Sequence, residues 1–385
     1  MAKKNWKLID AKDNHHADGW QATKNDVANA PDDFHVRMRT LRCGLSQSVD
    51  VIEINNGSFR FTVLPSRGMG VWKGWLGDLP IGWDSPVHGP VHPSHVQLTE
   101  PSGLGWLDGF DELLCRCGMV SNGAPEFAEN GSLVYPLHGR VANRPAHFVE
   151  VEIDGDEISI KGIVEESRFH FTKLRLYSTL RTKFGEKGFR IHDEVENYSA
   201  SESEMQMLYH INFGAPLLEA GAELVVPVDE IVPRNEWAAQ GIGHWSTYSE
   251  PTAGMEERVY FYSLLGDNQG HSQALLKNAK ANRGVSLDFN TKQLSCFTLW
   301  KNETALNDGY VTGLEPGTNF PNPRSFEGEQ GRVVTIKPGA MYAMDVGLTV
   351  HDNGESIAEV EKQIESLQAK KPPTIHEKPQ PNWCA

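Results

Sequence analysis

Five short segments carry polar, charged and aromatic side chains where the alternation of the flanking strands breaks. Two of them hold residues with acid–base capacity, Glu315 in 313–317 (GLEPG) and His210 in 208–212 (LYHIN). A glutamate is ionised and an imidazole can gain or lose a proton near neutral pH, because their unperturbed pKa values are about 4.3 and about 6.5. The other three segments are 65–70 (PSRGMG), 109–122 and 137–140 (LHGR).

Both acid–base candidates lie in predicted strands. Glu315 precedes Pro316, which cannot donate a ladder hydrogen bond, so its carboxylate is predicted at the rim of a sheet. His210 lies in the alternating run 205–213, which places Tyr209 on the opposite face. The structural alternatives are a solvated strand-end glutamate and a hydrogen-bonded core histidine. Because the two residues are distant in sequence, only the fold can bring them together.

Three histidines, His88, His92 and His95, are the best candidates for a metal site. Pro90 and Pro93 exclude the regular helix that would align positions 88 and 92, and no acidic residue follows closely. We therefore predict a proline-rich loop with solvated or hydrogen-bonded histidines and no bound metal. A metal-dependent isomerase or hydrolase is the competing interpretation.

Composition narrows the class of protein further. The chain has 385 residues, 39% of them hydrophobic, which suffices for a large buried core. With 51 acidic against 36 basic residues, the formal net charge of -15 argues against nucleic acid as a partner. No stretch matches the roughly 20 apolar residues of a membrane span, and the first residues lack the apolar core of a signal peptide, so a soluble, cytoplasmic protein is expected.

The cysteines and the nucleotide motifs add two expected absences. Five cysteines predict reduced thiols, and the pair Cys115 and Cys117 lacks the second pair that a zinc site would need. We find no Walker loop, dinucleotide fingerprint or nucleophile elbow, so nucleotide cofactors are unsupported.

Period-two patterns predict an all-β, mainly antiparallel fold. The run 174–184 alternates apolar and charged residues, a turn follows, and 189–195 repeats the alternation. The segments 149–160 and 51–63 read as two further hairpins. Two packed sheets forming one large domain are the economical architecture.

Three parts of the chain are expected. Residues 1–39 form an N-terminal extension, 40–352 the β-sandwich domain, and 353–385 a C-terminal helix with a proline-rich tail. The helix is predicted over 356–369, where Ile357, Val360, Ile364 and Leu367 form an apolar stripe. The tail is expected to be ordered only if it docks on the body.

Taken in order, these segments resemble the aldose 1-epimerase (galactose mutarotase) superfamily, and more closely its less characterised, epimerase-like branch. The similarity covers roughly residues 40–350. The resemblance rests on the motifs PSRGMG (65–70) with GWDSP (82–86), the CRCGMVSNGAP stretch ending at 125, LHGR (137–140), LYHINFG (208–214) and TGLEPGTNFPNP (312–323).

The resemblance implies a β-supersandwich that binds a free sugar and interconverts its α and β anomers without cofactor or metal. In that family a base takes the proton of the C1 hydroxyl while an acid protonates the ring oxygen, the ring opens, and it recloses on the other face. By position, Glu315 would be the base and His210 the acid. The sugar would be the partner, with no nucleic acid or membrane, and the chain would be a monomer or homodimer.

Substrate-binding roles also follow from the resemblance. His138 would orient the sugar near its ring oxygen, beside Gly139, and the structural alternative is a turn histidine. Arg116 resembles the family's sugar-binding arginine, and Arg67 and Arg140 compete for that role. For each arginine the alternative is an ion pair with a carboxylate. Asp229 lies in a region comparable to that of a family aspartate.

Two further function classes stay open. The same cleft could bind or sense a sugar without turnover, because a fold does not fix a function. A lyase or hydrolase acting on a larger glycan is the third interpretation. Indole rings could form the cleft wall, and the candidates are Trp72, Trp75, Trp83, Trp106, Trp237, Trp245 and Trp300.

Overall fold

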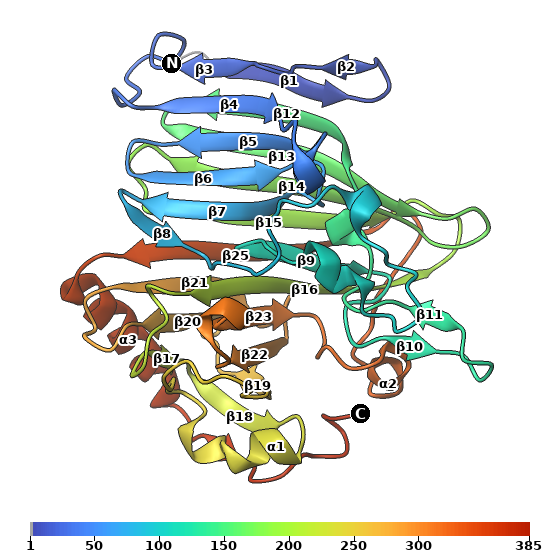
Figure 1. Cartoon of the computed structure of the whole chain (residues 1–385), viewed down its shortest axis with the longest axis vertical. Coiled ribbons are helices and arrows are strands. Elements are labelled where there is room, and N and C mark those ends of the chain that lie inside the picture. The colour runs from blue at the N-terminus through green and yellow to red at the C-terminus, as the bar shows by residue number, and fades with distance from the viewer. Residues whose placement is uncertain (1–2) are drawn as a thin grey trace.

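A computed structural model describes residues 3–385 of the chain and shows two large β-sheets packed face to face. Figure 1 shows the strands running across the view and stacked along the long axis of the molecule in two layers. Nearly all strand pairs are antiparallel, and β18 with β26 is a parallel exception. The all-β sandwich prediction is therefore confirmed.

One layer is a 10-stranded sheet, here called the back sheet. Its strands, in spatial order, are β17 (Glu223–Val225), β20 (His271–Lys277), β21 (Gly284–Asn290), β25 (Met341–His351), β15 (Gly188–Asn197), β14 (Lys173–Lys183), β13 (Glu157–Ser167), β12 (Ala146–Asp154), β1 (Lys4–Asp10) and β2 (His15–His16).

The other layer is a 14-stranded sheet, here called the site sheet. Its main order is β26 (Thr374–Ile375), β18 (Val228–Pro233), β19 (Arg258–Leu264), β22 (Cys296–Asn302), β23 (Val311–Gly317), β16 (Ser203–Gly214), β9 (Leu114–Met119), β7 (Gly70–Leu76), β6 (Phe59–Leu64), β5 (Asp50–Asn55), β4 (His35–Thr40) and β3 (Gln21–Thr23). In addition, β24 (Val334–Ile336) pairs with β16 and β8 (Leu79–Ile81) with β7.

Helices and a small hairpin lie outside the two large sheets. The hairpin is β10 (Glu126–Phe127) with β11 (Leu133–Tyr135), and the α-helices are α1 (Glu236–Gln240), α2 (Arg324–Glu329) and α3 (Gly354–Gln368). The 3-10 turns are η1 (Gly44–Ser46), η2 (Pro93–His95), η3 (Gly105–Gly109), η4 (Val141–Asn143), η5 (Ile242–His244) and η6 (Leu306–Asp308). Among residues 3–385, no helix has both the length and the apolarity to cross a membrane.

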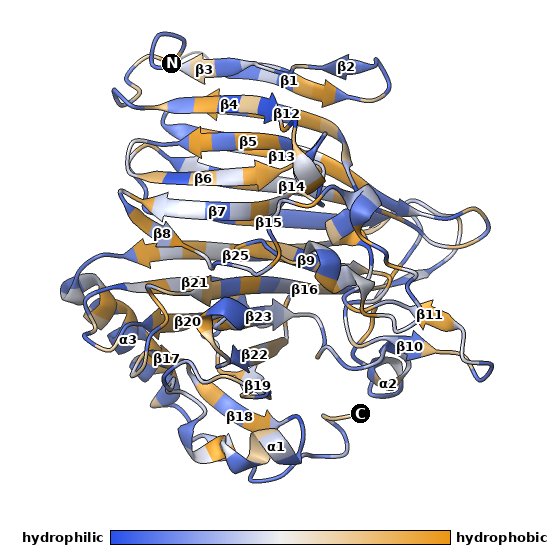
Figure 2. Cartoon of the chain, in the orientation of Figure 1, coloured by the Kyte–Doolittle hydropathy of each residue, from blue (hydrophilic) through white to orange (hydrophobic). Residues whose placement is uncertain are grey.

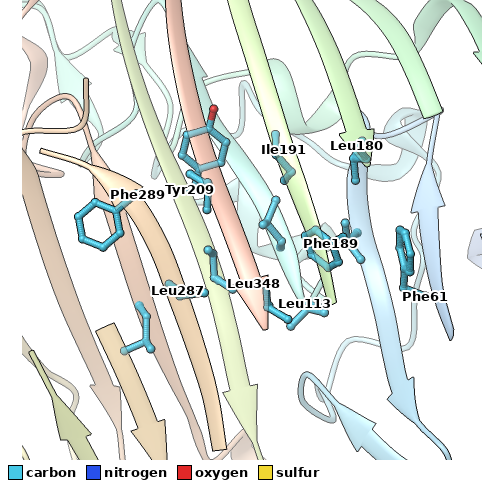
Figure 3. Packing of buried hydrophobic residues seen from close by; sticks show 14 of the residues in the cluster. Phe61, Leu113, Leu180, Phe189, Ile191, Tyr209, Leu287, Phe289 and Leu348 are labelled. Atoms are coloured by element: carbon cyan, nitrogen blue, oxygen red, sulfur yellow. The ribbon is translucent and has the colours of Figure 1, made fainter. Parts of the chain in front are cut away.

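The expected hairpins form as pairs β14 with β15, β12 with β13, and β5 with β6. Their alternation buries one face completely, so that Leu174 and Leu176 are 0% exposed. Figure 2 shows the resulting mixture of hydrophobic and hydrophilic positions along single strands. The inward side chains of both sheets, including Phe61, Phe189 and Leu348, meet in one core between the layers (Figure 3).

Both ends of the chain join the sheets. Residues 1–39 were expected as an extension, but the described part of this segment supplies β1 and β2 at the edge of the back sheet and β3 and β4 at the edge of the site sheet. Helix α3 begins after Asn353, whose side chain caps it by accepting from Ser356 N, and packs its predicted apolar stripe on Leu275. The tail then pairs β26 with β18, and Trp383 stacks on Phe320 at a centroid distance of 4.8 Å.

Candidate acid–base site

The central strand β16 presents successive side chains to the two faces of the site sheet. Tyr209 lies in the core between the sheets, whereas Leu208 belongs to a separate cluster on the outer face. His210 is two positions from Leu208 and contacts the rings of that same outer cluster. The neighbouring strand β23 lies beside β16 with Ile211 opposite Leu314, which brings Glu315 next to His210.

Glu315 and His210 are in direct contact. The distance from Glu315 Oε1 to His210 Nε2 is 3.2 Å, and the two side chains are 2% and 5% exposed. Within residues 3–385, the Glu315 carboxylate has no other hydrogen-bond or ion-pair partner. The fold therefore unites the two residues that the sequence singled out for acid–base chemistry.

Asn212 fixes which imidazole nitrogen faces the glutamate. Its Nδ2 donates to the carbonyl of Glu112 at 2.9 Å, which leaves Oδ1 facing His210 Nδ1 at 2.7 Å. Since Oδ1 can only accept, Nδ1 carries a proton that it donates to Asn212. In the neutral ring, Nε2 is then the basic nitrogen, and it is the atom that meets Glu315.

Burial sets the protonation of the pair. Desolvation raises the pKa of Glu315 well above its usual value, and nearby Glu257 raises it further while Arg234 opposes. Desolvation lowers the pKa of His210 well below its usual value, with a contribution from His138 in the same direction, while the bond to Asn212 opposes. Both directions favour a net-neutral pair that holds one proton between Oε1 and Nε2.

Aromatic rings surround the pair. Phe110 and Trp300 lie 5.0 and 5.4 Å from the His210 ring, centroid to centroid, both edge-on. His138 lies 5.3 Å from His210 and 4.6 Å from Trp106. Rings of this kind bind the apolar faces of sugars and also exclude water, which strengthens electrostatic interactions inside the site.

His138 is held as a neutral ring. Its Nδ1 lies 2.9 Å from the carbonyl of Asn122 and donates to it, while desolvation lowers the pKa of His138 to about 4. Its φ of 56° is in the left-handed region, which allows the tight turn before Gly139. A Cβ at Gly139 would lie 2.0 Å from the carbonyl oxygen of Ser121, so only glycine permits this close packing.

Two buried polar atoms beside the pair have no hydrogen-bond partner. Trp106 Nε1 and Thr298 Oγ1 are unpaired within the described chain, although their residues are each 1% exposed. Thr298 is the cross-strand partner of Glu315. A Cβ at Gly313 would lie 2.5 Å from Glu315 Oε1, so a glycine keeps space open beside the carboxylate. Buried orphan donors are rare, which makes these atoms candidates for ligand contacts.

Comparison with known proteins identifies the family. Residues 46–350 match a family model described as a domain of unknown function, DUF4432. The chain belongs to the DUF4432 family. A candidate aldose 1-epimerase from Klebsiella pneumoniae is 34% identical, with a TM-score of 0.95 over 98% of this chain and 99% of that chain. No curated protein matches the sequence.

More distant structures share the fold of this DUF4432 protein. A galactose mutarotase-like protein from Clostridium acetobutylicum is 14% identical, with a TM-score of 0.57 over 83% of this chain and 99% of that chain. A galactose 1-epimerase from Lactobacillus acidophilus is 12% identical, with a TM-score of 0.53 over 83% of this chain and 100% of that chain. The superfamily assignment made from the motifs is confirmed.

The DUF4432 chain does not place Arg116 with the acid–base pair. On β9, Cys115 is opposite His210 and Arg116 is opposite Tyr209, so Arg116 projects from the inner face. There it pairs with Asp193, and it also donates to Ser178 Oγ at 2.8 Å and to two backbone carbonyls. Every guanidinium N–H is used. The prediction that Arg116 binds sugar at this site is therefore wrong.

Arg67 and Asp229 also have other partners. Arg67 is 1% exposed and binds Glu112, Asn143 Oδ1 and the carbonyls of Val91 and Gly109, so it ties together the loops that carry the site's aromatic residues. Asp229 forms an ion pair with Lys371 of the tail. Among residues 3–385, neither side chain contacts Glu315 or His210. The predicted substrate-binding role of Arg67 is corrected to a structural one, because its buried guanidinium is held by protein groups, and that of Asp229 stays a prediction. Arg140 lines a separate cavity.

The histidine-rich segment is a loop with one short 3-10 turn, as its prolines predict. His92 Nδ1 accepts from Ser94 N and lies 2.7 Å from Ser94 Oγ, capping the 3-10 turn. Across residues 3–385, no group of three or more His, Cys, Asp or Glu side chains is arranged to hold a metal ion. No role was predicted for Asn212 or Thr298. Asn212 lies on the same strand as His210 but is oriented by the carbonyl of Glu112, and Thr298 is brought to Glu315 by strand pairing.

Proposed function

We propose that this DUF4432 protein interconverts the α and β anomers of a free sugar, with Glu315 and His210 exchanging protons with the substrate. The observation that carries the proposal is the 3.2 Å contact between Glu315 Oε1 and His210 Nε2 inside an aromatic enclosure. The likeness to a candidate aldose 1-epimerase supports the same reaction class.

The proton count of the pair suits this reaction. Ring opening moves the proton of the C1 hydroxyl to Glu315, breaks the bond between C1 and the ring oxygen, and moves a proton from His210 to that oxygen. The product is an open-chain aldehyde. After rotation about C1–C2, closure reverses both transfers on the other face. One proton resides on the pair throughout, on His210 before opening and on Glu315 after it.

Burial favours the tautomer with the proton on Glu315, which is the form that accompanies the aldehyde. The starting tautomer has a charged carboxylate and imidazolium, and sugar hydroxyls that donate to Glu315 would stabilise it. Because the Nδ1–H of His210 is bonded to Asn212, the proton that His210 exchanges with the substrate leaves and returns at Nε2. The enclosed pair can therefore switch tautomers with little change in net charge.

Sugar recognition is assigned to the surrounding side chains. Trp106, Phe110 and Trp300 offer ring surfaces, and the unpaired Trp106 Nε1 and Thr298 Oγ1 would bond to hydroxyls. Trp300 Nε1 is already held by Glu257 Oε2 at 2.6 Å, so that ring is fixed in place. Neutral His138 has no N–H left to donate, because its Nδ1–H is bonded to the carbonyl of Asn122. Its Nε2 would accept a hydrogen bond from a sugar hydroxyl.

The test is NMR anomer exchange across a panel of aldoses, deoxy-sugars and acidic sugars, with the full chain and with His210→Asn. Acceleration of at least one sugar, proportional to protein concentration and lost in His210→Asn, is expected. Saturable binding without acceleration would overturn the proposal in favour of a non-catalytic sugar-binding module. Release of new reducing ends from an oligosaccharide would replace it with a hydrolase or lyase. Action without cofactor, a cytoplasmic location and a monomeric or homodimeric state stay predictions.

A further inference from the structure

A cavity lies beside the loop that carries His138. Its volume is about 230 Å³, and it lies between the β10–β11 hairpin, the loop 136–140 and the turn between β13 and β14. His138 contacts the acid–base site, whereas Pro136 and Arg140 of the same loop line this cavity. The cavity is therefore distinct from the proposed sugar site.

Three arginines, Arg140, Arg144 and Arg168, line the cavity. Most arginines among residues 3–385 form an ion pair with a carboxylate, as expected in a chain of net charge -15. The arginines of this range with no carboxylate within ion-pair distance are Arg39, Arg140, Arg144, Arg168 and Arg283. Three of these unpaired side chains thus meet at one small cavity.

One carboxylate shares the cavity, but its oxygen serves the backbone. Glu166 Oε2 accepts from the N–H of Met119 at 2.7 Å and from that of Val120 at 3.3 Å. Glu166 is 7% exposed and feels the charges of Arg140 and Arg144 without pairing with either. The cavity keeps an excess of positive charge with guanidinium donors left over.

We propose that this cavity binds the oxyanion group of a small molecule, a phosphoryl or carboxylate group held by Arg140, Arg144 and Arg168. Planar guanidinium groups match such oxygens in pairs of hydrogen bonds. The volume is below the roughly 300–1,000 Å³ of sites for drug-sized ligands, so the group is carried by a small metabolite.

The rim adds an apolar side to the cavity. Phe171 lines it and is 63% exposed, and Arg168 lies over the Phe171 ring at 4.8 Å. Val134, on the facing hairpin, is 41% exposed. The carbon part of the ligand is expected to lie between these two side chains.

The proposal is tested by isothermal titration of the full chain with inorganic phosphate, glycerol phosphate and the open-chain carboxylate glycerate at low ionic strength. Saturable binding is expected, and the tighter probe class shows whether the group is phosphoryl or carboxylate. Arg144→Gln and Arg168→Gln should each weaken binding about tenfold, because a hydrogen bond to a charged group is lost. Arg168 is exposed, so its variant should fold even if that of Arg144 does not.

Arg283→Gln is the matched control, since Arg283 is also unpaired but lies elsewhere. It should bind the probes as the unmodified chain does, and so should Glu315→Gln, which separates this site from the proposed sugar site. Absence of saturable binding up to about 10 mM of every probe, or equal weakening by Arg283→Gln, would overturn the proposal.

Discussion

Two buried ionisable pairs lie on opposite sides of the site sheet, where two consecutive residues of β16, Tyr209 and His210, meet them. Tyr209 donates to Asp193, the partner of Arg116, on the inner face, whereas His210 contacts Glu315 on the outer face. The side chains of the first pair are 0% exposed, and those of the second are 5% and 2% exposed. Burial alone therefore does not distinguish them.

The two pairs differ in how many of their hydrogen-bonding atoms have partners. Arg116 uses all of its donors, and Asp193 accepts from both Arg116 and Tyr209. Glu315 has His210 as its one partner within residues 3–385, and unpaired atoms of Thr298 and Trp106 lie in its surroundings. A saturated pair stabilises the sandwich, whereas an unsaturated pair has bonding capacity left for a substrate.

Breaking the saturated pair should give the largest effect. Arg116→Met leaves Asp193 buried without its cation, and we expect the free energy of unfolding to fall by about 3–5 kcal/mol. Urea denaturation at neutral pH measures this loss. A change below about 1 kcal/mol would show that the inner pair is not the structural one.

His138, which lies beside the outer pair, should make the stability of the protein depend on pH. Its pKa is lowered to about 4 in the folded chain, so the unfolded chain takes up a proton first as the pH falls below about 6.5. The contribution of His138 to stability should be constant above that pH and fall by about 3 kcal/mol as the pH approaches 4. His138→Asn, which can keep the positive φ and the donation to Asn122, should flatten this part of the profile.

Stability measured by urea denaturation at pH 4.5 and 7.5 compares the two chains. His95→Asn, in an exposed loop, is the control and should leave the slope unchanged. An unaltered slope in His138→Asn would mean that this histidine is not held neutral by its site.

Substitutions of Asn212 test whether this residue positions the His210 ring, and they should have a smaller effect. Asn212→Ala removes the acceptor of His210 Nδ1–H, and anomer exchange should slow about tenfold. Asn212→Asp should restore much of the rate and shift the His210 limb of the pH–rate profile to higher pH, because a carboxylate raises the pKa of a neighbouring imidazole. Equal losses in both variants, with an unmoved profile, would reduce Asn212 to a packing residue.

Sequence patterns within single segments predicted the features that depend on neighbouring residues along the chain. Alternation identified the hairpins and the buried face of β14, and the motif order identified the superfamily. The face on which Arg116 projects depends instead on the register of β9 against β16, a pairing between distant segments that alternation cannot supply. For the same reason no role was predicted for Thr298, whose place opposite Glu315 depends on the pairing of β22 with β23. Asn212 shares a strand and a face with His210, but the contact that orients its amide comes from the distant carbonyl of Glu112. Asp229 was assigned to the site by resemblance, and in the structure the tail provides its partner, Lys371.

The most direct test of the account is Glu315→Gln, measured for both anomer exchange and unfolding. Exchange of the accelerated sugar should fall by about 10²–10⁴-fold, the range of a lost acid–base group. The free energy of unfolding should not fall, because burial raises the pKa of Glu315 and an amide removes the cost of its ionisation. Unchanged exchange, or a loss of stability as large as that of Arg116→Met, would contradict the claim that the outer pair is catalytic and the inner pair structural.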